Sequence, residues 1–186
     1  MALNVRIDFK NKYEIKPVSE DLRITTFVSI VQGDIPVLLQ VEISNEAHEL
    51  LPNVYNLAFG PLKTDGLIDD KVELAHQDYS KVFSTILLSA FTYLIRNPEH
   101  ALGVDGSDNA RAFLYYWTLQ RNFDYLDQQF DIFGLKYYVR ITRFGKKQYD
   151  DPFDFTDIVP EPVKIEKGAK MPPDLMYNYF IFKIKK

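Results

Sequence analysis

The fold is decided by residues 22–43, which read LRITTFVSIVQGDIPVLLQVEI. The first part, Leu22–Val31, is rich in β-branched side chains, as is typical of a strand. The tripeptide Gln32-Gly33-Asp34 then predicts a turn, because glycine adopts a positive φ without steric cost. On the return, apolar residues occupy every second position, at Val37, Leu39, Val41 and Ile43. The stretch therefore predicts an antiparallel β-hairpin.

Outward from the hairpin, the same period continues in both directions. Upstream, apolar residues recur at every second position, at Val5, Ile7 and Phe9 and again at Tyr13 and Ile15. Downstream, residues 54–59 predict another strand, which ends at Gly60-Pro61. We therefore expect the first sixty residues to form an antiparallel meander.

Beyond residue 60 the apolar period changes from that of a strand to that of a helix. Residues 79–96 carry apolar side chains at spacings of three and four, with Asp78 as the N-cap and Asn97-Pro98 as the stop. A second helix is predicted from Asp108 to Gln129. The apolar faces of these two helices predict the following core residues: Phe83, Leu87, Phe91, Leu94, Leu119, Phe123 and Leu126.

Three short strands are also predicted in the second half, over residues 101–104, 135–141 and 177–184. Before the last of them, residues 145–174 are rich in proline and aspartate, which is typical of an extended surface arm. We expect residues 1–186 to form a single domain of the α+β class. Its mainly antiparallel sheet, built from the N-terminal meander and the C-terminal strands, would pack against the two helices.

Composition limits the chemistry that the chain can perform. Its 186 residues include no cysteine, which excludes a disulfide framework, thiolate catalysis and cysteine-containing zinc sites. The three histidines lack the spacing of a zinc-binding helix, and no P-loop or dinucleotide-binding motif is present, so we expect no metal and no cofactor. The formal net charge of -4 is unlike that of a protein that coats nucleic acid. With no signal peptide or membrane-spanning stretch, the expected location is cytoplasmic.

One charge pattern indicates a binding site. Each predicted helix carries a cation in its first turn, Lys81 and Arg111, where the helix dipole disfavours positive charge. An external phosphate or carboxylate, held by Lys81, Ser107 and Arg111, would compensate these charges. In the alternative interpretation, Arg111 forms a structural ion pair with an internal carboxylate, for which the candidates are Asp69, Asp70 and Asp78.

Four short motifs resemble those of an uncharacterised bacterial family found mostly in Bacteroidetes. They are YNLAFG at 55–60, IDD at 68–70, DYSKV at 78–82 and GSDNAR at 106–111. The chain departs from the family's pattern at Phe113, where the family usually has an arginine, and at His76-Gln77, where it usually has Asn-Gly. The resemblance implies the fold and the cytoplasmic location, and it implies no activity.

We therefore expect a cytoplasmic bacterial binding or interaction protein of a regulatory, toxin–antitoxin or phage-defence type. We expect a protein partner and self-association, no membrane contact, and we do not favour nucleic acid as a partner. The alternative function is an enzyme that acts on a phosphate-containing substrate, such as a nuclease or a nucleotide-modifying toxin. In that enzyme Lys81 and Arg111 would stabilise developing charge, and His76 or Asp70 would be the candidate base.

Overall fold

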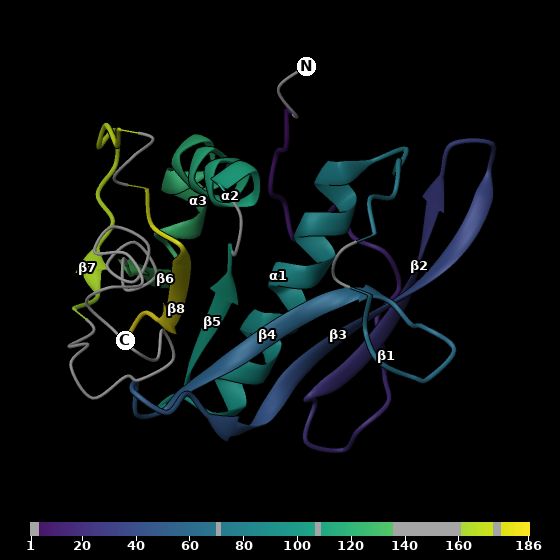
Figure 1. Ribbon diagram of the computed structural model, residues 1–186, viewed down its shortest axis with the longest axis horizontal. Helices are drawn as coiled ribbons and strands as arrows, with labels where there is room; N and C mark the ends of the chain where they lie inside the picture. Colours follow the sequence, from purple (N-terminus) through teal and green to yellow (C-terminus); the bar gives the residue numbers. More distant parts are fainter. Residues whose placement is uncertain (1–3, 70–71, 107–108, 136–160, 173–175) are drawn as a thin grey trace, which may run out of the picture.

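The predicted hairpin belongs to an eight-stranded sheet, which a computed structural model shows together with three helices (Figure 1). The structure describes residues 4–69, 72–106, 109–135, 161–172 and 176–186. The strands are β1 (Lys16–Pro17), β2 (Ile24–Val31), β3 (Ile35–Ala47), β4 (Val54–Pro61), β5 (Ala101–Asp105), β6 (Phe130–Leu135), β7 (Val163–Lys164) and β8 (Tyr179–Ile184). The helices are α1 (Tyr79–Arg96), α2 (Asn109–Arg121) and α3 (Phe123–Leu126). The strand order is β1-β2-β3-β4-β5-β8-β6-β7, so the α+β class is confirmed.

The predicted hairpin is confirmed, and the structure gives its register. Strands β2 and β3 pair antiparallel from Ile24↔Glu42 to Val31↔Ile35, and β4 pairs antiparallel with β3. The turn between β2 and β3 contains two residues with positive φ, Gly33 at 82° and Asp34 at 59°. Glycine and aspartate tolerate this conformation better than other residues do, which explains why the turn forms here.

The connection from β4 to β5 runs through α1, and it makes these two strands parallel. Helix α1 has the predicted bounds: the Asp78 side chain caps it by accepting a hydrogen bond from the Lys81 amide, and Asn97 ends it. A parallel pair needs a long crossover, usually a helix, whereas antiparallel neighbours need only a turn. The meander therefore ends at β4, where the parallel pair begins.

The last strand, β8, lies inside the sheet between β5 and β6 and is antiparallel to both. A glycine in each of the two neighbouring strands makes room for a tyrosine ring. Tyr179 occupies the space where a Cβ of Gly103 would lie, and Tyr177 occupies that of Gly134. The final strand predicted over 177–184 is confirmed, and it completes the centre of the sheet.

The second helix differs from its prediction. The segment from 108 to 129 is not one helix, because α2 ends at Arg121 and α3 covers only Phe123–Leu126. The intervening Asn122 donates side-chain hydrogen bonds to the carbonyls of Thr118, at 2.8 Å, and Val5, at 3.0 Å. Asparagine competes in this way with the helical hydrogen bonds of the backbone, and α2 ends at this residue. Asp108 lies outside the described residues.

Two predicted strands are also placed differently. Strand β6 begins at Phe130, five residues earlier than predicted, and residues 136–141 lie outside the described residues. Gly134 lies within β6, and the Tyr177 ring packs over it. Residues 5–8 belong to no strand and Phe9 begins a turn, and side chains bind the amides of residues 6–9.

The described part of the predicted arm contributes to the sheet and to the core. Residues 145–160 and 173–174 lie outside the described residues. Within the described part, β7 pairs with β6 at the edge of the sheet, and Ile165 is buried in the main core. The described part of the arm therefore adds a short strand to the edge of the sheet, next to β6.

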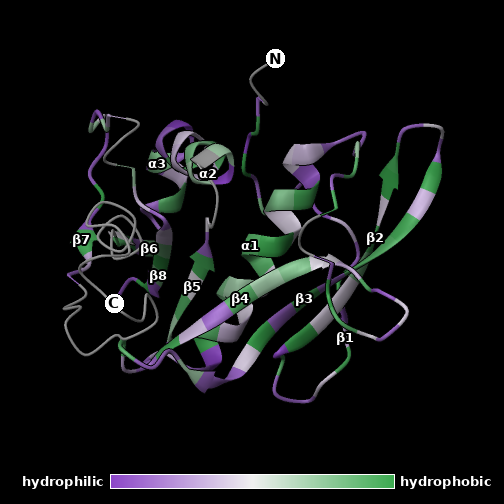
Figure 2. Ribbon diagram, in the orientation of Figure 1, coloured by the Kyte–Doolittle hydropathy of each residue, from purple (hydrophilic) through white to green (hydrophobic). Residues whose placement is uncertain are grey.

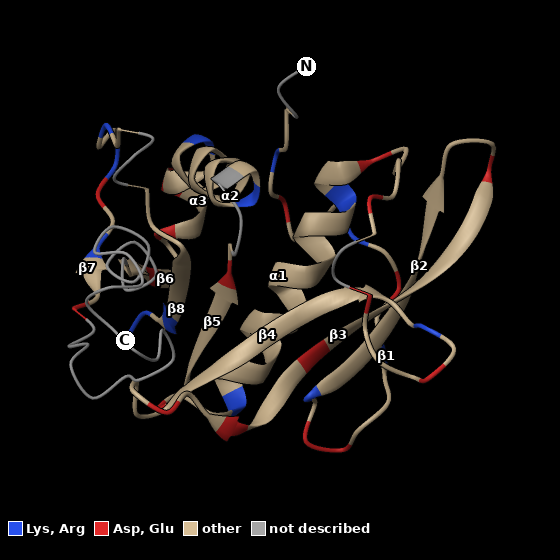
Figure 3. Ribbon diagram, in the orientation of Figure 1, with Lys and Arg blue, Asp and Glu red and all other residues tan. Residues whose placement is uncertain are grey.

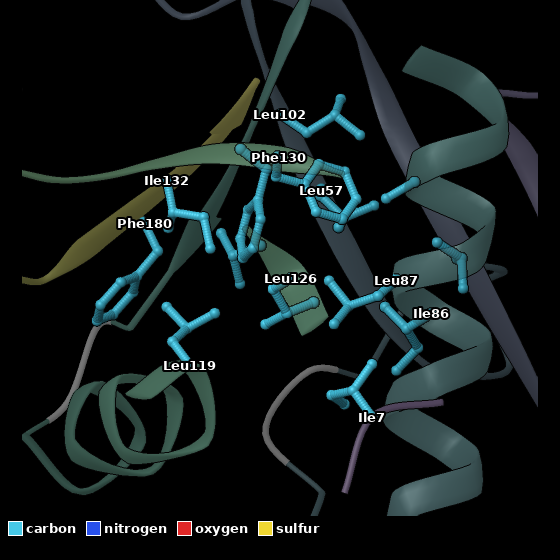
Figure 4. Packing of buried hydrophobic residues seen from close by; sticks show 14 of the residues in the cluster. Ile7, Leu57, Ile86, Leu87, Leu102, Leu119, Leu126, Phe130, Ile132 and Phe180 are labelled. Carbon is cyan, nitrogen blue, oxygen red and sulfur yellow. The ribbon is translucent and has the colours of Figure 1, made fainter. Parts of the chain in front are cut away.

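The core lies between the helices and one face of the sheet, and hydrophobic residues run through α1 and the central strands (Figure 2). Ile7, Ile86, Leu87, Leu119 and Phe180 gather there from elements far apart in the sequence (Figure 4). Of the predicted core residues, Leu87, Leu94, Leu119 and Leu126 are buried, and Phe83, Phe91 and Phe123 are partly buried against them. A smaller cluster covers the opposite face of the sheet around Tyr179 and Ile181.

Candidate functional site

The residues of the predicted anion spot follow the carboxyl ends of β4 and β5 in the chain. Because these strands are parallel, their carboxyl ends share one edge of the sheet, and in the chain β4 precedes α1 and β5 precedes α2 (Figure 1). Ligands of sheets with parallel strands commonly bind at such an edge. The side chains at this edge decide whether it can bind an anion.

Lys81 and Asp78 interact with near neighbours at the start of α1. The Asp78 carboxylate accepts the Lys81 amide at 2.8 Å, so it compensates the positive end of the helix dipole. The Lys81 ammonium lies 4.5 Å from the centre of the Tyr13 ring, a distance typical of a cation–π contact. The flank of α1 that carries Lys81 thus faces the chain leading into β1.

The other members of the predicted spot are only partly described. Arg111 is half-buried in the first turn of α2, and Ser107 and Asp70 lie outside the described residues. The backbone of Asp69 is fixed against β4, because its amide donates to the Pro61 carbonyl at 2.8 Å. The grouping of Lys81, Ser107 and Arg111 around an anion stays a prediction, as does the pairing of Arg111 with Asp69, Asp70 or Asp78.

His76, the candidate base of the enzyme alternative, contacts a buried serine. Its Nδ1 lies 2.7 Å from the Ser29 hydroxyl, and burial lowers the pKa of His76. Ser29 is fully buried in β2, so no substrate reaches its oxygen. The residue pair Val31↔His76 forms an antiparallel bridge that covers the edge of β2. The Ser29–His76 contact therefore has a structural role, because it connects the chain before α1 to β2.

An apolar cavity of about 50 Å³ lies between α1 and α2. Phe59, Phe83 and Tyr115 are among the residues that line it. This volume is far below the range of small-molecule sites, about 300–1,000 Å³. The cavity is a gap in the packing of the two helices and is too small for a ligand.

Residues 4–9, which we call the N-terminal segment, lie between α1 and the junction of α2 and α3. Their amides form hydrogen bonds alternately with the two sides. The amides of Arg6 and Asp8 donate to Ser80 and Ser84 of α1, each at 2.9 Å. Those of Ile7 and Phe9 donate to Asn122, at 2.8 Å, and Tyr125, at 2.9 Å. Side chains of two helical elements thus replace the neighbouring strands that an extended segment usually needs.

A cleft of about 700 Å³ opens between the N-terminal segment and the α2–α3 junction. This volume falls within the range of small-molecule sites, about 300–1,000 Å³. Three cations line the cleft, Arg6 and Lys10 from the N-terminal side and Arg121 from the end of α2. Basic positions on both the N-terminal segment and α2 are visible in Figure 3. Two carboxylates, Asp8 and Asp124, complete its charged lining.

The cleft has more positive than negative side chains, and the partners of its carboxylates add to this excess. The Asp124 carboxylate pairs with Lys167 at 2.6 Å, and that of Asp8 accepts the Lys10 amide at 2.9 Å. Arg121 donates to the neutral side-chain oxygen of Asn4 at 3.0 Å. Within the described residues, the side chains of Arg6 and Lys10 form no hydrogen bond or ion pair. Arrangements of this kind attract phosphate and carboxylate groups.

Sequence reasoning missed this cleft because its residues are separated by more than a hundred positions. Two signals in the sequence were nevertheless available. Helix α1 has hydroxyl groups at Ser80, Ser84 and Thr85 on an otherwise apolar surface, and Asn122 interrupts a helical pattern. Buried polar groups need hydrogen-bond partners, so these residues indicate an additional segment packed beside α1.

Comparison with known proteins places the chain in a family. The model of a family described as "Family of unknown function (DUF6934)" matches residues 9–155. The chain belongs to the DUF6934 family. No curated protein and no solved structure matches it. The DUF6934 match contains Arg111 and Arg121 and begins after Arg6, so the basic cleft lies partly outside the matched range.

Two further searches of the described residues bear on the candidate site. No described helix has both the length and the apolar character needed to span a membrane. In the same part of the chain, no three side chains of His, Asp or Glu come together as metal ligands. The basic cleft is therefore the feature from which we derive a function.

Proposed function

We propose that this protein binds a small phosphorylated molecule in the cleft between the N-terminal segment and the α2–α3 junction. The observation that carries the proposal is the convergence of Arg6, Lys10 and Arg121 on one cavity of about 700 Å³. A phosphate group accepts paired hydrogen bonds from a guanidinium and attracts an ammonium as a point charge. A cavity of this size also has room for the organic part of a ligand such as a mononucleotide.

The same observation favours binding over catalysis. Catalysis of phosphoryl chemistry needs a group that moves a proton within reach of the reacting atoms. No histidine is among the described residues that line the cleft. Of its two carboxylates, that of Asp124 pairs with Lys167 and that of Asp8 accepts the Lys10 amide. The proposal includes three further points: the protein has a regulatory role, it is located in the cytoplasm, and it binds a protein partner.

The experiment measures the thermal shift of the protein with three probes: inorganic phosphate, adenosine 5′-monophosphate and adenosine, at matched ionic strength. A ligand that binds only the folded state raises the melting temperature, and at a hundred times Kd the stabilisation is about 2.7 kcal/mol. We expect a rise with both phosphates and none with adenosine. The rise should decrease with added salt, because the cleft is open to solvent.

Single substitutions locate the binding site. Two of the substituted residues, Arg111 and Arg121, lie at opposite ends of α2. Arg121→Gln and Lys10→Gln should each abolish the rise in melting temperature with phosphate. Lys12→Gln, at a nearby exposed position, should leave the rise unchanged. Arg111→Gln tests the spot predicted at the other end of α2. Loss of the rise in Arg111→Gln with retention in Arg121→Gln would transfer the site to the edge of β4 and β5. No rise with either phosphate would reject the proposal.

A further inference from the structure

Trp117, the one tryptophan of the chain, lies on the solvent-exposed side of α2. It is 55% exposed, whereas every other described tyrosine and phenylalanine is buried or half-buried. Within the described residues, its ring contacts no other aromatic ring and no cation, and its indole N–H donates no hydrogen bond. A tryptophan is usually mostly buried, with its N–H paired. The packing of the fold therefore does not explain the position of this ring.

Trp117 lies one helical turn before Arg121, a cation that lines the basic cleft. Side chains four residues apart lie on the same face of a helix, with about 5–6 Å between their Cβ atoms. Both residues are exposed on that face. The Arg121 guanidinium donates to the Asn4 side chain at 3.0 Å and does not cover the indole. An exposed aromatic ring thus lies one turn beyond the cations of the cleft.

This ring is the only exposed apolar group in its surroundings. Within the described residues of α2 and α3, no other large hydrophobic side chain is exposed. A protein partner usually covers about 800 Å² on each side, with several apolar side chains at the centre of the contact. A single flat ring beside a group of cations suits a smaller ligand, a nucleotide, whose base stacks and whose phosphate pairs with the cations.

We infer that the ligand of the cleft is a nucleotide whose base stacks on Trp117 while Arg6, Lys10 and Arg121 hold its phosphate. This inference rests on the proposed function, to which it adds the base. In a nucleoside 5′-monophosphate one ribose separates the base from the phosphate, a span comparable to the rise of about 6 Å over the four residues from Trp117 to Arg121. Every base has a π face, so Trp117 selects nucleotides as a class rather than one base.

The fluorescence of the single tryptophan reports this contact directly. The protein is titrated with adenosine 5′-monophosphate and, separately, with ribose 5-phosphate, which has the same sugar and phosphate and lacks the base. We expect adenosine 5′-monophosphate to quench the fluorescence and ribose 5-phosphate to leave it unchanged. Isothermal titration calorimetry should show that the nucleotide binds about 5- to 150-fold more tightly, the range that stacking of one base contributes.

Substitutions of Trp117 separate stacking from phosphate binding. Trp117→Leu keeps an apolar side chain and removes the ring, so adenosine 5′-monophosphate should lose its advantage while the affinity for ribose 5-phosphate stays the same. Trp117→Phe supplies a smaller ring and should restore part of the advantage. The matched control is Ile95, which is also 55% exposed but lies on α1, and Ile95→Ala should leave both affinities unchanged.

The outcomes distinguish this inference from the proposed function. Equal affinities for the two probes, with unchanged fluorescence, would overturn the stacking contact and leave phosphate binding in place. Quenching that persists undiminished in Arg121→Gln would also overturn the inference, because Trp117 would then bind the base independently of the cleft. If neither probe binds, the proposed function is wrong and the inference is wrong with it.

Discussion

At the scale of single residues, Gly134 shows why a glycine can stand in the middle of a strand. The Tyr177 ring covers this position in β6, and Tyr177 is itself buried, so it has no space into which to withdraw. We expect Gly134→Ala to lower the free energy of unfolding by about 1–3 kcal/mol, the usual cost of overpacking. Urea denaturation measures this difference.

Removal of the ring supplies the control for that substitution. In a Tyr177→Ala background, Gly134→Ala should cost much less, because the added methyl group then has room. The difference between the two costs is the coupling energy of a double-mutant cycle. Equal costs in both backgrounds would show that the glycine is needed for a reason other than the ring.

The sequence predicts part of this residue-scale detail. A glycine within a strand pattern indicates that something approaches the backbone closely. The sequence does not say that the ring belongs to Tyr177, because that contact depends on the position of β8 next to β6. Gly103 and Tyr179 repeat the arrangement on the other side of β8, and they were unpredictable for the same reason.

At the scale of elements, Asn122 joins the N-terminal segment to the α2–α3 junction. It accepts the Ile7 amide and donates to the Val5 carbonyl, and it is 8% exposed. Asn122→Ala leaves both backbone groups without their partner, at a cost of about 1–3 kcal/mol for each buried group that stays unsatisfied. We expect faster hydrogen exchange at residues 5–9 and lower stability.

The control for this prediction lies a few residues further along the chain. Gln128 is exposed, and its side chain donates only to the Asp124 carbonyl. Gln128→Ala should therefore leave the exchange rates of residues 5–9 unchanged. If Asn122→Ala also leaves them unchanged, hydrogen bonds to Asn122 do not hold the segment.

The elements themselves were predictable where one period dominates a long stretch. The hairpin of β2 and β3 and helix α1 are such cases, and their bounds are confirmed within a few residues. The N-terminal segment shows the limit of this reasoning. Its alternation predicted a strand, and the structure instead buries Val5 and Ile7 in a segment that pairs with no strand. Helical side chains take that place here.

At the scale of the whole molecule, the candidate site depends on contacts that only the complete fold creates. Arg6 and Arg121 line one cleft because the N-terminal segment crosses the end of α2. The sequence places these residues 115 positions apart, by the difference of their numbers, and no local pattern connects them. By contrast, Lys81 and Arg111 each lie in the first turn of a helix, a local pattern that the sequence shows directly.

The pH dependence of stability is also a property of the whole molecule. Burial lowers the pKa of all three histidines, His48, His76 and His100, and the Arg23 charge lowers that of His100 further. They come from three separate regions of the fold: the His48 ring lies 5.6 Å from that of Tyr179, His76 forms a hydrogen bond with Ser29, and His100 forms one with Tyr93. Each is therefore held neutral at pH 7.

The sign of the effect follows from proton linkage. As the pH falls below the unfolded value of about 6.5, the unfolded chain takes up protons at its histidines before the folded protein does. The stability that the neutral histidines contribute is therefore fully present above the unfolded pKa of about 6.5, and it is lost as the pH falls toward the lower pKa values of the folded state. Each histidine contributes at most about 1.4 kcal/mol per pH unit in this window.

We expect the free energy of unfolding to fall between pH 7 and pH 5, as measured by urea denaturation at each pH. His76→Asn should lower stability at pH 7, because it alters the contact with Ser29, and should also make the decline less steep, because one titrating group is gone. Lys12→Gln, at an exposed position, should reproduce the slope of the unmodified protein. A free energy of unfolding that stays constant over this range would show that the folded protein accommodates charged histidines as readily as water does.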